Sequence, residues 1–349
     1  MRESNAIAAN SRIKKRNLCI LTAMGALLLV FMAISLRMGA YSTPLSQMLL
    51  GIFGQADDSK INAVVQGVRF PRICTALIAG MGLGVTGCIL QAILQNPLAS
   101  ASTLGISQGA GFGAALAIIV LGMGSGSAGM STVSMLSFLS SMLVSLVILT
   151  AARFRGISPE TMVLGGVALS AMFTGGTTLM QYFADDVELS TFLFWTFGDL
   201  GSPDWSQIRV MGFVVAAALI FFMLRRWDYN ALYAGEQTAV SLGMNVGLTR
   251  ILNLLICTLV AAVIVSYIGI INFIGLVAPH IVRKLVGENY CYLIPGSALM
   301  GGILLLLGDL VSRMIISPVI LPIGAITSFL GAPLFLYLLF KGKRKNGYS

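Results

Sequence analysis

The sequence predicts an all-α polytopic membrane protein with about ten transmembrane helices, and three observations lead to this prediction. Of its 349 residues, 57% are hydrophobic and only 10% are charged, whereas soluble domains carry roughly 25% charged residues. Apolar runs of about 20 residues, enough to cross a hydrocarbon core about 30 Å thick, recur along the chain. The chain also contains 39 glycines, which allow helices to approach one another closely in a bilayer.

The predicted spans follow these apolar runs in order. They cover residues 18–38, 70–93, 98–122, 131–152, 159–183, 206–226, 249–269, 271–286, 294–314 and 321–340. The first span follows a basic run, as a signal peptide does. Its apolar stretch exceeds the usual length of about 7–15 residues and no A-x-A site follows, so we interpret it as a retained helix.

Two of the spans look irregular. The span that starts near residue 98 is rich in Gly, Ser and Thr, and the span 271–286 is short and contains Pro279. Broken helices at membrane depth are tolerated only where protein or a water-filled cavity covers the freed backbone. Both spans therefore indicate a transport pathway rather than a simple bundle of anchors.

Basic residues predict the orientation in the membrane. Segments 1–17 and 341–349 are basic ends on either side of a transmembrane domain at 18–340. Cytoplasmic loops carry an excess of Lys and Arg, and an even number of spans places both ends on that side. We therefore expect a multi-pass protein of the cell membrane, surrounded by lipid, with both termini cytoplasmic. We expect no nucleic-acid partner, although basic tails alone are compatible with one.

Two connections between spans are long enough to have a role. Residues 184–205 are acidic and lie outside in this topology, and their aromatic middle is compatible with a short helix at the interface. Residues 227–248 lie inside. Within them, 231–242 is compatible with a short helix, and Gly243 is placed to end it.

Metal binding and covalent catalysis find no support. The lone His280 cannot build a metal site, and the cysteines have no metal-binding spacing; these are Cys19, Cys74, Cys88, Cys257 and Cys291. Motifs of the G-x-x-x-x-G-K-[ST] and H-E-x-x-H types are absent from the sequence. We predict a transport subunit that is not an enzyme and has no cofactor of its own.

Asp309 is a carboxylate inside the ninth span, where charges are costly and usually paired or functional. At a spacing of i, i+4 it can pair with Arg313, which we favour as a structural pair. A proton relay is the alternative, but no series of other acids or histidines aligns with Asp309.

Several motifs together resemble a known family. They are RFPR at 69–72, QNPLASASTLGISQGAG at 95–111, NFIGLVAPHIVRKLVG at 272–287, GDLVSR at 308–313 and LPIGAITSFLGAPLFLYLL at 321–339. In this order they resemble the FecCD-type permeases of iron-siderophore and cobalamin ABC importers. The resemblance implies a type II ABC importer permease fold, a second permease subunit in a homo- or heterodimer, two ABC ATPase subunits that bind ATP, and an extracytoplasmic siderophore-binding protein.

The resemblance also implies roles for individual residues. Arg69, Arg72 and Arg313 would dock acidic side chains of the binding protein, although membrane-interface anchors explain them too. Asn96, Pro97 and Leu98 would form a cytoplasmic gate, or only a tight turn. Glu236, Ala239 and Gly243, in the coupling loop 227–248, would contact the ATPase, or belong to a solvated connector.

The fifth span has the small, mildly polar character of a pathway lining for a bulky chelate. The candidate lining residues are Ser170, Thr174 and Thr177, and tight helix packing explains them nearly as well. The predicted function is translocation of a ferric siderophore into the cytoplasm by an ATP-driven importer. Cobalamin or haem import is the alternative within this architecture. An ion-coupled secondary transporter is less favoured, since Asp309 is the chief ionisable residue at membrane depth.

Overall fold

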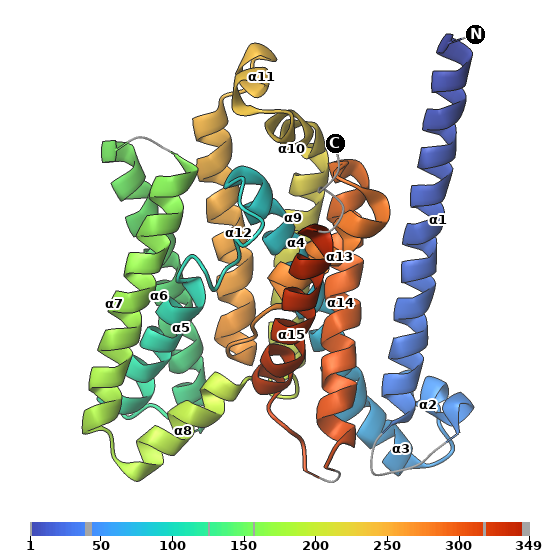
Figure 1. Cartoon of the computed structure of the whole chain (residues 1–349). Helices are drawn as coiled ribbons and strands as arrows, with labels where there is room; N and C mark the ends of the chain where they lie inside the picture. Colours follow the sequence, from blue (N-terminus) through green and yellow to red (C-terminus); the bar gives the residue numbers. More distant parts are fainter. Residues whose placement is uncertain (1, 39–43, 125, 156–157, 317–318, 344–349) are drawn as a thin grey trace.

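The computed structural model describes residues 2–38, 44–124, 126–155, 158–316 and 319–343, and every regular element in these ranges is a helix (Figure 1). The predicted all-α fold class is therefore confirmed. The elements are α1 (Arg2–Arg37), α2 (Leu45–Ile52), α3 (Ser59–Val64), η1 (Val65–Arg69), α4 (Phe70–Ile93), α5 (Ile106–Ala115), η2 (Leu116–Val120), α6 (Gly126–Arg155), α7 (Pro159–Phe183), α8 (Asp186–Phe197), α9 (Trp205–Leu224), α10 (Arg226–Tyr233), α11 (Glu236–Ser241), α12 (Val246–Ile268), α13 (Ile274–Val286), α14 (Tyr290–Met314) and α15 (Ile323–Lys343).

Each of the ten predicted spans contains a helix, but the helices differ in length. Among the described residues, seven helices are long and apolar enough to cross a membrane. They lie in α1, in α3–η1–α4, and in α6, α7, α9, α12 and α14. Ile106–Val120 and Ile323–Leu338 are shorter apolar helices, and α13 has 13 residues with Pro279 inside. The structure thus supports a membrane-spanning bundle without establishing ten complete spans.

Two predicted helices have different bounds in the structure. The third span was expected from residue 98, but residues 98–105 form turns and α5 begins only at Ile106. Gly105 has φ +81° at this junction, a left-handed conformation that helices do not continue through. The helix expected at 231–242 is divided into α10 and α11, because Gly235 adopts φ +119° between them. The basic segment 1–17 is helical from Arg2 onward.

Three predictions from local sequence agree with the structure. The acidic connection 184–205 contains α8. The Asp185 side chain accepts a hydrogen bond from the N–H of Glu188, and the Glu188 side chain accepts one from the N–H of Asp185, which together form a complete capping box. Gly243 follows the end of α11 with φ +83°. The pair Asp309–Arg313 lies within one helix, α14, with an N–O distance of 2.7 Å.

The centre of the bundle consists of α4, α12 and α14, most of whose residues are buried, while few residues of α1 and α7 are buried. Glycine brings the central helices close together. A Cβ at Gly80 of α4 would overlap the carbonyl oxygen of Gly301 in α14, and one at Gly87 would overlap Gly275 O in α13. These are the close helix contacts that the glycine content predicts.

The two ends of the bundle are different (Figure 1). The N-terminal end of α1 lies at the same end as α10 and α11, and α15 runs toward that end. The helices α2, α3 and α8 lie at the opposite end. We call these the α11 end and the α8 end.

Candidate functional site

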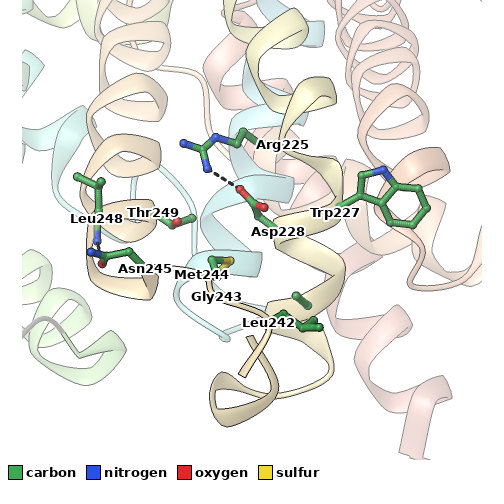
Figure 2. A pocket seen from close by; sticks show the side chains of 10 residues that line it. Arg225, Trp227, Asp228, Leu242, Gly243, Met244, Asn245, Leu248 and Thr249 are labelled. Carbon is green, nitrogen blue, oxygen red and sulfur yellow. Dashed lines mark hydrogen bonds and ion pairs between the residues drawn. The ribbon is translucent and has the colours of Figure 1, made fainter. Parts of the chain in front are cut away.

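A pocket of about 390 Å³ opens at the α11 end, between the start of α10 and the start of α12 (Figure 2). In Figure 2 the side chains of Arg225 and Asp228 point toward each other, and their Nη1 and Oδ2 atoms are 2.7 Å apart. The pocket is lined by Arg225, Trp227, Asp228, Ala231, Leu242, Gly243, Met244, Asn245, Leu248 and Thr249. It therefore combines charged, amide and apolar groups in one concave surface.

The predicted coupling residues lie in α11 and just after it, in three different environments. Glu236 is the first residue of α11 and forms an ion pair with Arg250 of α12. Ala239 is fully buried beneath the helix. Gly243 is exposed at the pocket edge, and the N–H groups of Gly243 and Met244 donate back to α11 carbonyls in a Schellman motif. Only Gly243 of the three thus lies in the pocket.

Large apolar side chains of the α10–α11 connection are exposed, and two of them, Trp227 and Leu242, line the pocket. The exposed fractions are 63% for Trp227, 58% for Val240 and 72% for Leu242. All three lie in the connection between α9 and α12, outside the candidate spans. Exposed apolar groups gathered on one surface typically mark a protein-binding site. The α10–α11 connection therefore exposes apolar surface of the kind that a protein partner covers.

A buried tyrosine holds α10 firmly to α12. The Tyr229 hydroxyl donates to Asn253 Oδ1 at 2.6 Å, and Tyr229 is fully buried. Burial raises the pKa of this hydroxyl well above its usual value, so it remains a neutral donor. This hydrogen bond and the burial of Tyr229 fix α10 against α12.

The predicted gate residues form the turn after α4, at the same end. Gln95 adopts φ +47°, an uncommon conformation for a residue other than glycine. Asn96 Oδ1 accepts a hydrogen bond from the N–H of Leu98 at 2.9 Å, and Leu98 is 46% exposed. With Pro97 between them, these residues form a fixed turn with an exposed leucine at its tip. The turn borders a second pocket, of about 430 Å³, which it shares with α10.

A cluster of arginines and aspartates lies at the α8 end. Asp309 is completely buried and bridges two arginines. Its Oδ1 is 2.7 Å from Arg72 Nε, and its Oδ2 is 2.7 Å from Arg313 Nη2. The exposed carboxylate of Asp199 lies 3.1 Å from Arg72 Nη1. This network ties α4, α14 and the loop after α8 together.

The candidate docking arginines have internal partners and little exposed surface. Arg69 and Arg72 are only 6% and 8% exposed. Arg69 Nη1 donates to Leu36 O at 3.0 Å, and Arg313 Nη1 donates to Met38 O at 3.1 Å, so both hold the end of α1. Docking by these side chains therefore requires them to exchange partners, and it stays a proposal. The sequence does not reveal this burial, because the partners are distant along the chain.

The predicted pathway residues lie on α7. Thr174 is exposed, and Ser170 and Thr177 are half-buried. The hydroxyls of Ser170 and Thr177 donate to carbonyls one turn earlier in α7, at 2.8 Å each. The face they form is consequently only mildly polar, because two of its three hydroxyls are bonded to the backbone of α7.

In the part of the chain that the structure describes, no group of three or more His, Cys, Asp or Glu side chains is placed to hold a metal ion. His280 packs against the ring of Phe335, with 5.9 Å between the ring centroids. This contact gives the histidine a packing role between α13 and α15.

Comparison with known proteins agrees with these features. The FecCD transport family matches residues 27–341. A Methanocaldococcus jannaschii protein described as an ABC transporter permease is 47% identical over 91% of this chain and 94% of its own length. The Fe(3+)-citrate import system permease of Bacillus subtilis is 34% identical, with 96% of this chain and 99% of the relative covered. The hemin transport system permease of Yersinia pestis is 31% identical, covering 97% and 99%.

A solved structure is similar over most of the fold. It is described as an inward-facing conformation of a metal-chelate type ABC transporter, and it has a TM-score of 0.82 and 30% sequence identity. The similarity covers 92% of this chain and 99% of the other. The resemblance that the sequence motifs indicate is thus confirmed at the level of sequence and of structure.

Proposed function

Because the chain belongs to the FecCD transport family, we propose that it moves a ferric siderophore, or a related iron chelate, inward as the permease of an ATP-driven importer. The family match over residues 27–341 is the observation that carries this proposal. The B. subtilis relative named for Fe(3+)-citrate aligns with almost the whole chain, which favours an iron chelate as cargo. The chelate arrives with its iron already bound, so the permease needs no metal ligands.

We place the ATPase contact on the α10–α11 connection. The pocket beside Gly243 and the exposed apolar groups around it support this assignment. The nucleotide binds to two partner ATPase subunits, because this sequence has no phosphate-binding loop. The α11 end is then cytoplasmic, and both basic ends of the chain lie on that side.

The remaining sites follow from this orientation. The turn Asn96-Pro97-Leu98 narrows the cytoplasmic end of the pathway, and the face of α7 with Ser170, Thr174 and Thr177 lines it, together with a second permease subunit. The largely exposed surface of α7 supports this role, since a second subunit and a passing cargo both need such a surface.

Docking of the binding protein belongs to the α8 end. Arg72 already holds an exposed carboxylate, that of Asp199. We propose that an acidic side chain of the binding protein takes the place of Asp199 on Arg72. Arg suits this exchange because its guanidinium group grips a carboxylate through two N–H groups.

Haem or cobalamin import by the same architecture is the second candidate, and the Y. pestis relative named for hemin favours haem. An ion-coupled mechanism has less support. Asp309 is buried and engaged by two arginines, which gives it a structural role in the cluster.

Uptake in a deletion strain tests the proposal. Cells that lack this chain are supplied with radioiron on citrate, on a hydroxamate siderophore or on a catecholate siderophore, and separately with haemin and cyanocobalamin. We expect loss of uptake of one iron chelate, with restoration by the intact gene. Loss of haemin or cyanocobalamin uptake alone would reject the iron-chelate assignment, and unchanged uptake of all five would reject the transport function.

A further inference from the structure

Arg250 connects three segments at the α11 end. It lies in the second turn of α12, and only 2% of its side chain is exposed. Its Nη2 is 2.7 Å from Glu236 Oε2, and its Nη1 donates to Glu236 Oε1 at 3.3 Å. Its Nε donates to Ile93 O at 3.1 Å. One buried guanidinium therefore bonds both the first residue of α11 and the last residue of α4.

The bond to Ile93 completes the end of α4. The N–H groups of Gln95 and Asn96 donate back to carbonyls of the last turn, and Gln95 adopts φ +47°. This Schellman pattern leaves the carbonyl of the final helical residue, Ile93, without a partner inside the helix. Arg250 supplies that partner, and its positive charge is favourable at the negative end of the helix dipole.

The proposed gate follows at once. Only two residues separate Ile93 from Asn96. The turn has a second attachment to the same connection, since Gln95 Nε2 donates to Leu232 O in α10 at 3.3 Å. The start of the turn is thus bonded to α10 directly and to α11 through Arg250.

We infer that Arg250 is a positioning residue that transmits movement of α11 to the turn Asn96-Pro97-Leu98. This inference rests on the proposed function, in which an ATPase moves α11 and this turn narrows the pathway. Arginine suits the task because its planar guanidinium holds a carboxylate at two points and still has Nε free for a carbonyl. Lysine keeps the charge but cannot make all three bonds in fixed directions.

The test is a nucleotide-dependent change in the exposure of the turn. The complete importer is placed in lipid vesicles with Leu98→Cys as reporter, because Leu98 is 46% exposed. Cys19, Cys74 and Cys291 are replaced by Ser, while the buried Cys88 and Cys257 remain. The rate of labelling by a maleimide is measured without nucleotide and again after ATP and vanadate are added, which trap the ATPase subunits with bound nucleotide. ATP hydrolysis is measured on the same samples.

For Arg250→Lys, we expect at least about a fivefold smaller effect of nucleotide on labelling, with ATP hydrolysis within about twofold of the parent. If Arg250 only stabilises the fold and transmits no movement, Arg250→Lys would leave the effect of nucleotide on labelling unchanged. Arg226→Lys is the matched control, because Arg226 lies at the same end and its Nη1 donates to Met223 O of the preceding helix. We expect this control to keep the parental response.

If Arg250→Lys fails to assemble, the same labelling is measured on Glu236→Gln. Glu236 is half exposed, and removing its charge leaves the hydrogen bond from Arg250 to Ile93 in place. A parental response in the assembled variant would overturn the inference while leaving the proposed function intact. Equal labelling rates with and without nucleotide in the parent complex would contradict the proposed function, and with it this inference.

Discussion

The buried charge of Asp309 provides the sharpest test of the structure. Asp309 is completely buried and lies 2.7 Å from one nitrogen of Arg72 and 2.7 Å from one of Arg313. Asp309→Asn keeps the shape of the side chain and removes its charge. Two buried guanidinium groups then lose their shared counterion, and breaking a buried ion pair from one side costs about 3–5 kcal/mol.

This loss is large enough to measure by thermal unfolding. With an unfolding entropy of about 2.1 cal/mol/K per residue, the loss lowers the apparent Tm of the chain by roughly 4–7 °C. The assay is unfolding of the purified permease in detergent at a fixed scan rate, since unfolding of such proteins is often irreversible. Asp228→Asn is the control, because its pair with Arg225 is partly exposed and is worth less than about 1 kcal/mol.

Asp309→Asn combined with Arg313→Gln separates the ion pair from other effects. Because the double variant also removes one uncompensated cation, we expect it to be more stable than the sum of the two single losses predicts. A Tm for Asp309→Asn within about 1 °C of Asp228→Asn, or strictly additive losses, would refute the buried network.

Three further predictions concern other parts of the fold. Gly87→Val should abolish the folded permease, measured as monodisperse yield in detergent, because its side chain would overlap Gly275 O, whereas Gly25→Val, with open space around Gly25, should keep the parental yield. Gly243→Ala should destabilise the end of α11 by about 1 kcal/mol, because Gly243 has φ +83°. Gly243→Asp should leave the permease in the membrane but uncouple transport from ATP hydrolysis. If uptake and hydrolysis stay proportional in the Asp variant, an ATPase contact at Gly243 is contradicted. Asp199→Asn should tighten binding of the binding protein by about two- to fivefold, because it frees Arg72 from an exposed pair worth up to about 1 kcal/mol; unchanged or weaker affinity in a titration would exclude direct contact with Arg72.

Features with a local signal were predictable from the sequence. The helix α8 starts with a capping box formed by two residues three apart, Asp185 and Glu188. Gly243 ends α11 because only glycine adopts φ +83° easily. The pair Asp309–Arg313 is set by helical spacing alone. In each case the cause and the effect lie within one or two turns of chain.

Features that depend on tertiary contacts were not predictable. Arg72 and Asp309 are 237 residues apart in sequence, and no local pattern joins them. Long-range contacts also bury Arg69 and Arg72 and partly bury Arg313, the arginines for which a docking role was expected. Substitution of these arginines would change the stability of the cluster as well as docking, so Asp199→Asn is the more specific test of docking.

Arg250 was missed as a functional candidate, although a signal was available. It is a charged residue near the start of an apolar span, at 249–269, and such residues are usually paired or functional. Its partners Glu236 and Ile93 were not apparent, because they lie in separate helices. The break at Gly235 was missed for a related reason, since glycine permits φ +119° without requiring it.

Uptake by the reconstituted complex tests most directly whether this chain forms the pathway of an ATP-driven chelate importer. The permease, its ATPase subunits and its binding protein are placed in lipid vesicles, and entry of radioiron bound to citrate, a hydroxamate or a catecholate siderophore is followed over time. We predict accumulation of one chelate only with ATP, and none when vanadate blocks hydrolysis. Accumulation that persists without ATP and is lost when the proton gradient is removed would contradict an ATP-driven mechanism.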